Sequence, residues 1–202
     1  MHIFSDIPTF QPKAQQGLSE LLLQSPKLSN QILHIAIILY SIPVSKRCAM
    51  YGRYAVDPRK LDRLVRLLRL PLPDFQAHYD IRPSQTVPVI RDTGNGSEWA
   101  SMRWGLIPHW AKEAKTGYST FNAQVETAAQ KPAFPEPWAH RRCITPATGF
   151  YEWQPLETGK KRPWYFENID GQALALAGLW DHWKDEKTGN GEDALLVTTR
   201  SI

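Results

Sequence analysis

Short runs of β-branched and aromatic residues, separated by proline and glycine turns, fill this chain from residue 78 onward. Such runs are typical of strands. We expect strands over residues 86–90, 99–104, 142–145, 149–153, 164–167, 173–180 and 194–199, with a turn over 92–96. Many strands with few helices predict an α+β fold built on a curled, barrel-like and mostly antiparallel sheet.

A strand over residues 52–56 and then a helix are expected before this region. Asp57 is suited to an N-cap, and Pro58 stands at the first helical position. Apolar residues follow at helical spacing, namely Leu61, Leu64, Val65 and Leu68. Pro71 ends the pattern, and a second short helix is expected around residues 125–130.

The composition divides the 202-residue chain near residue 50, since all eight tryptophans lie beyond residue 98. We interpret residues 1–49 as an extension and residues 50–202 as one domain. The extension contains an apolar run over residues 32–44. This run is shorter than the roughly 20 residues that a membrane-spanning helix needs. We therefore expect neither a membrane anchor nor a secretory signal.

The net charge and the cysteine content indicate which partners and metal sites the chain could have. The net charge of +4 permits a nucleic-acid partner but does not require one. Cys48 and Cys143 provide neither a disulfide framework nor a zinc-binding spacing. We expect no metal, no small-molecule cofactor and a reducing, cytoplasmic location, with Cys143 as a small core residue.

Five segments, taken in order, resemble those of one known family. They are Met50-Tyr51-Gly52-Arg53-Tyr54, Tyr79-Asp80-Ile81-Arg82-Pro83, Met102-Arg103-Trp104-Gly105-Leu106-Ile107-Pro108-His109-Trp110, Phe121-Asn122-Ala123-Gln124-Val125-Glu126-Thr127, and Arg142-Cys143-Ile144-Thr145-Pro146-Ala147-Thr148-Gly149-Phe150-Tyr151-Glu152-Trp153. Together they are similar to the SRAP family, whose members are SOS-response-associated peptidases or abasic-site processing proteins. The resemblance covers about residues 50–199 and leaves out the extension.

The resemblance implies a partner and a chemistry. Family members capture abasic sites in single-stranded DNA through a cysteine made N-terminal by removal of methionine. Its α-amine condenses with the sugar aldehyde, and its thiol closes a thiazolidine ring. An Asn, a Glu and a late His orient groups and move protons. By resemblance, Asn122 and Glu152 take the first two roles, in a monomer located at the bacterial-type nucleoid that also carries the family's autopeptidase (hydrolase or lyase-like) activity.

The sequence departs from the family pattern at three places. Tyr51 stands at the family Cys position, and a phenol cannot close a thiazolidine. Its α-amine also lies within a peptide bond, because 49 residues precede Met50. The family His belongs to an H-x-R-x-P motif after the strand at residues 194–199, whereas this sequence ends at Ile202. Gln124 replaces an Arg that usually meets phosphate.

Four residues are predicted to contact DNA. Arg53 and Gln124 are placed to meet the backbone, and Trp104 and Trp153 are candidates to stack on bases. Tryptophan is also an ordinary core residue, so burial remains an alternative for both.

Three hypotheses remain open at this point. The chain is a working abasic-site crosslinking protein, or a pseudoenzyme that binds single strands without capturing them, or a degenerate product truncated at its C-terminal end. Since the family continues beyond residue 199, the truncation hypothesis predicts that the strand at residues 194–199 has an open edge.

Overall fold

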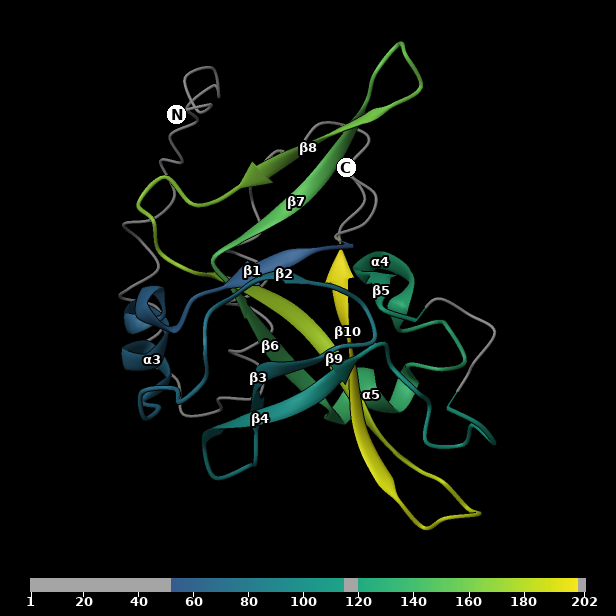
Figure 1. Ribbon diagram of the computed structural model, residues 1–202. Coiled ribbons are helices and arrows are strands. Elements are labelled where there is room, and N and C mark those ends of the chain that lie inside the picture. Colours follow the sequence, from purple (N-terminus) through teal and green to yellow (C-terminus); the bar gives the residue numbers. More distant parts are fainter. Residues whose placement is uncertain (1–51, 115–119, 200–202) are drawn as a thin grey trace.

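The computed structural model describes residues 52–114 and 120–199. Figure 1 shows a barrel of strands, with a further sheet across one side and short helices around it. The elements are β1 (Tyr54–Val56), the 3-10 helix η1 (Pro58–Lys60), α3 (Asp62–Leu68), β2 (His78–Ile81), β3 (Thr86–Asp92), β4 (Ser97–Trp104), β5 (Asn122–Gln124), α4 (Val125–Ala128), α5 (Pro135–His140), β6 (Arg142–Ala147), β7 (Gly149–Pro155), β8 (Lys161–Phe166), β9 (Leu174–Lys184) and β10 (Gly191–Thr199). The extension over residues 1–49 and Tyr51 lie outside the described residues. Within those described, no helix has the length and apolar character needed to cross a membrane.

Five strands close into a barrel in the order β4, β3, β6, β9 and β10, because β10 pairs back to β4. This closing pairing is parallel and aligns Leu195 with Trp104. β5 also lies parallel to β10, and the remaining pairings in the described part of the chain are antiparallel. The predicted α+β fold with a curled, mostly antiparallel sheet is confirmed.

The expected open edge at residues 194–199 is wrong. β10 pairs with β9 along one edge. Along the other edge it pairs first with β4 and then, from Val197 to Thr199, with β5. Barrel closure thus supplies hydrogen-bond partners for both edges of the strand.

β10 is buried from Ala194 to Thr199 because both of its faces are covered. Leu195 and Val197 belong to the core inside the barrel. Leu196 points the other way and packs with Ala128 and Phe134, which the helical segments after β5 supply. Alternating side chains of one strand therefore enter two separate clusters.

The helix expected after Asp57 forms in two pieces. The Asp57 side chain accepts a hydrogen bond from the Arg59 backbone N–H at 3.0 Å, as its N-cap role predicts. The first turn is 3-10, and Leu61, with φ −93° and ψ 0°, separates it from α3. α3 then buries Leu64, Val65 and Leu68 on the core, so the predicted apolar face is confirmed.

A four-stranded sheet in the order β2, β1, β7, β8 lies across the barrel (Figure 1). Tyr54 of β1 pairs with Phe150 of β7 on one side and with Ile81 of β2 on the other. All three side chains are buried in the same core as Leu195. One face of this sheet therefore packs on the barrel.

A buried carboxylate ties the segment after β4 to the barrel wall. Asp181 of β9 is fully buried and accepts hydrogen bonds from the backbone N–H of His109 at 2.9 Å and from Arg141. The His109 Nδ1 also lies 3.0 Å from Asp181 Oδ2. Pairing of this kind is what allows a charge to be buried in the core.

Gly178 lies close to atoms of the two neighbouring strands, and this close packing can be tested by substitution. Its neighbours across the sheet are Cys143 of β6 and Val197 of β10. An added Cβ would lie 2.8 Å from Cys143 Sγ and 2.8 Å from the Leu196 carbonyl oxygen. We predict that Gly178→Ala lowers the free energy of unfolding by about 1–3 kcal/mol.

Urea titration followed by tryptophan fluorescence measures this change. Gly52→Ala is the matched control, since a Cβ on Gly52 meets no atom within 4 Å. Equal stability of the two variants would contradict the tight approach at Gly178.

Candidate functional site

The start of β1 and the middle of β7 form the first part of the candidate site. Tyr54 pairs with Phe150, and the Tyr151 backbone N–H donates to the Arg53 carbonyl oxygen at 2.9 Å. Extending this antiparallel register by one more residue sets Gly52 opposite Glu152. The extended register therefore sets the residue that follows the family Cys position across from the residue that carries the predicted catalytic carboxyl.

Glu152 is on the side of β7 that faces the barrel. Phe150, two residues earlier, is buried in the core, and side chains two apart on a strand share a face. Glu152 is half-buried, and its Oε1 atom is fully buried. Its cross-strand partner is Trp164 of β8. A carboxyl group shielded from water in this way is suited to moving protons.

Asn122 begins β5 and pairs with Val197 of β10. The preceding carbonyl, that of Phe121, accepts hydrogen bonds from the Val197 backbone at 2.9 Å and from Trp104 Nε1 at 2.8 Å. Asn122 is half-buried, and its Oδ1 atom is fully buried. These contacts fix the backbone from which the side chain projects.

Trp104 is a core residue, so the prediction that it stacks on bases is wrong for this structure. The indole is only 1% exposed. Its ring lies edge-on to Tyr54 at 5.2 Å and to Phe121 at 6.1 Å between centroids. Trp104 thus joins the segment that leads to Asn122 with the strand that lies beside Glu152.

Arg53 and Trp153 come together on the opposite face of the four-stranded sheet from Glu152. The Arg53 guanidinium lies 5.0 Å from the centre of the Trp153 ring, and its Nε is 3.1 Å from Asp80 Oδ1. Both predicted DNA contacts are thus engaged within the protein. Their place on the outer face follows from strand alternation, because Glu152 and Trp153 are consecutive.

Gln124 closes β5 opposite Thr199 and precedes α4. Its side chain is exposed and therefore open to a ligand. The sequence argument did not single out two exposed aromatic residues, Trp110 and Tyr79, or the half-buried Trp164. Trp110 is 60% exposed and Tyr79 is 53% exposed, while Trp164 lies opposite Glu152. If the residues of β7 and β8 are paired outward from the turn between them, Trp164 falls opposite Glu152. This pairing could have identified Trp164 from the sequence.

Cys143 is buried at 1% exposure in the barrel. Burial raises the pKa of its thiol to about 12, so the nucleophilic thiolate is disfavoured at neutral pH. The expectation of a small core cysteine is confirmed. Among the residues that the structure describes, no group of three or more His, Cys, Asp or Glu side chains is arranged to hold a metal ion.

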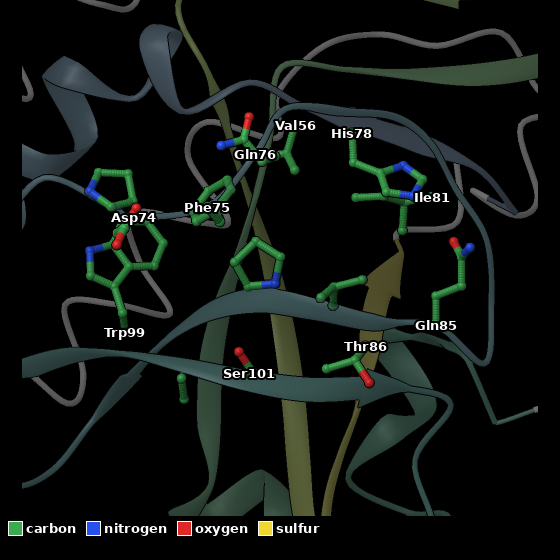
Figure 2. Close-up of a pocket in the computed structure, with 14 residues that line it drawn as sticks. Val56, Asp74, Phe75, Gln76, His78, Ile81, Gln85, Thr86, Trp99 and Ser101 are labelled. Carbon is green, nitrogen blue, oxygen red and sulfur yellow. The ribbon is translucent and has the colours of Figure 1, made fainter.

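A cavity of about 570 Å³ lies between the β1–β2 and β3–β4 pairs (Figure 2). Its walls include Val56, Ile81 and Trp99, and Figure 2 shows Phe75 beside Trp99 at its rim. The Trp99 indole is held by a hydrogen bond from Nε1 to the Pro71 carbonyl at 3.0 Å. None of the predicted site residues within the described chain lines this cavity.

A closed five-stranded barrel, with Asn122 on a strand paired to β10 and Glu152 on a strand paired to β1, defines the class of protein. The model of the family described as SOS response associated peptidase (SRAP) matches residues 50–202, and the chain belongs to this family.

Several curated relatives carry the name abasic site processing protein. YoaM of Bacillus subtilis (strain 168) is 41% identical over 152 residues, which are 75% of this chain and 67% of that protein. YoqW of the same organism is 36% identical over 131 residues, or 65% of this chain and 58% of that protein. HMCES of Xenopus tropicalis is 32% identical over 154 residues, or 62% of this chain and 46% of that protein. The chain thus spans less than two thirds of the last two relatives.

Two solved structures share the fold. A protein from Bacteroides thetaiotaomicron superposes with a TM-score of 0.62 at 25% identity, covering 73% of this chain and 67% of that chain. A protein from Bordetella bronchiseptica gives a TM-score of 0.59 at 29% identity, covering 73% and 71%.

The burial of Cys143 predicts its reactivity. We expect no alkylation of Cys143 by iodoacetamide at about pH 8 in the folded protein, because the thiol is both inaccessible and protonated. Peptide mass spectrometry measures its modification separately from that of Cys48. Denaturation in guanidinium should make Cys143 reactive, which serves as the control. Rapid labelling without denaturant would contradict the burial.

Proposed function

We propose that this chain binds single-stranded DNA at abasic sites through the surface around Gly52, Asn122 and Glu152, and that it does not capture the site covalently. The observation that carries the proposal is the register of β1 and β7, whose extension beyond the Tyr151–Arg53 hydrogen bond sets Gly52 opposite Glu152. Three further observations support it: the match to the family, the names of relatives such as YoaM, and the half-buried position of Asn122.

The residues present favour binding and proton transfer over covalent capture. A partly shielded carboxyl and an amide are suited to orient the hydroxyls and aldehyde of an open abasic sugar. Thiazolidine formation needs a free α-amine next to a β-thiol. Tyr51 has a phenol at that place, and the 50 residues before it leave its nitrogen in an amide bond. We propose a monomer as the binding species.

The first test is for covalent capture by the full chain. We predict that incubation with a single-stranded oligonucleotide bearing one abasic site gives no borohydride-independent shifted band on a denaturing gel. The reason is that neither the amine nor the thiol is available at residue 51. Binding of the same oligonucleotide under native conditions is the companion measurement. A band that forms without borohydride would overturn the proposed loss of capture.

The second test restores the missing groups. A chain that starts at Met50 and carries Tyr51→Cys gains a thiol, and methionine is readily removed before cysteine, which frees the α-amine. We predict partial recovery of the borohydride-independent band, because Asn122 and Glu152 remain in place. The Met50 start with Tyr51 unchanged is the matched control. A Tyr51→Cys chain as inert as its control, although folded, would show that the surrounding surface does not hold the aldehyde.

A further inference from the structure

Two hairpins project from the body of the protein at opposite ends of Figure 1. The β7–β8 hairpin is exposed over residues 154–163 and carries Lys160, Lys161 and Arg162 against one carboxylate, Glu157. The β9–β10 hairpin, over residues 184–192, carries two lysines against three carboxylates. The two projections therefore have opposite net charge.

Lys160, Lys161 and Arg162 are three consecutive basic residues with no carboxylate within ion-pair distance among the residues that the structure describes. Eight arginines elsewhere lie within ion-pair distance of an acidic side chain, namely Arg53, Arg59, Arg63, Arg66, Arg82, Arg91, Arg103 and Arg141. Partnered charges of this kind largely cancel one another at a distance. The three adjacent cations at the β7–β8 turn thus form a concentrated positive patch.

The register of the hairpin places this patch on the ribbon that leads outward from the candidate site. Glu152 pairs with Trp164, and the next pair on the same face is Gln154 with Arg162. Arg162 therefore lies one step beyond the Glu152–Trp164 pair, about 7 Å further along the strand. Lys161 pairs with Pro155 on the other face, and the Lys160 carbonyl accepts a hydrogen bond from Leu156 within the turn. The cations thus continue outward from the site along one ribbon.

We propose that the β7–β8 hairpin is a phosphate-binding arm that holds the DNA backbone beside the bound abasic nucleotide. Arg162 contacts the phosphate nearest to Glu152, and Lys160 and Lys161 contact phosphates further along the strand. The arm gives affinity without sequence preference, since contacts to phosphates carry no base information. This inference rests on the proposed function, because it assigns the path of the same nucleic acid.

The experiment compares two pairs of lysines of equal charge. Lys160→Ser/Lys161→Ser alters the proposed arm, and Lys184→Ser/Lys187→Ser alters the other hairpin. Both pairs are made in the full chain, and a third variant carries Arg162→Ser alone. Anisotropy titrations with a labelled single strand bearing an abasic analogue are run at several salt concentrations. Circular dichroism confirms that each variant is folded.

We expect the slope of log affinity against log salt, which is negative, to become shallower by about 1.4 in the Lys160/Lys161 variant. Each lost contact to a single strand reduces the magnitude of this slope by about 0.7. The ratio of the unaltered chain's affinity to the variant's affinity should then fall roughly sevenfold between 50 and 200 mM salt, as follows from that slope. Arg162→Ser should make the slope shallower by about 0.7, and the Lys184/Lys187 pair should leave it unchanged.

The outcomes separate the arm from the function on which it rests. Unchanged slopes in both β7–β8 variants, with DNA binding retained, would overturn the arm and leave single-strand binding intact. An equal loss in the Lys184/Lys187 variant would also overturn it, because the effect would then reflect net charge alone. If the unaltered chain binds no single-stranded DNA at low salt, the proposed function fails, and the arm fails with it.

Discussion

The parallel pairing of β10 with β4 is the interaction on which the rest of the structure depends. The Gly105 backbone N–H donates to the Leu195 carbonyl oxygen at 2.7 Å where the two strands meet. Without this closure, β10 would expose a row of unpaired backbone groups at the centre of the fold. The same edge of β10 then continues to β5, so closing the barrel also places Asn122.

The candidate site is supported from inside the barrel. Trp104 contacts Tyr54 through its ring and Phe121 through its indole N–H, which connects the two halves of the site through one buried side chain. Aromatic contacts of this geometry add to the stabilisation from burial alone. The Trp104 side chain therefore supports the site from the core and is too buried to contact a ligand.

β7 serves two purposes because its side chains alternate. Phe150 anchors the strand in the core, and Glu152 lies on the same face at the margin of the barrel. Trp153, the next residue, points to the outer face and packs against Arg53. Beyond this point the strand extends away from the barrel and enters the hairpin that bears Lys160, Lys161 and Arg162 (Figure 1).

The sequence by itself determined the cap at Asp57, most of the long strands, the motif residues Asn122 and Glu152, and the tyrosine at residue 51. It did not predict β2, β5 or α5, whose short sequences show no clear alternation or helical spacing of apolar residues. Only the tertiary structure decided that Trp104 is buried while Trp153 faces outward, and that β10 has two covered edges. Those outcomes depend on which strands pair, and pairing joins residues that are far apart in the chain.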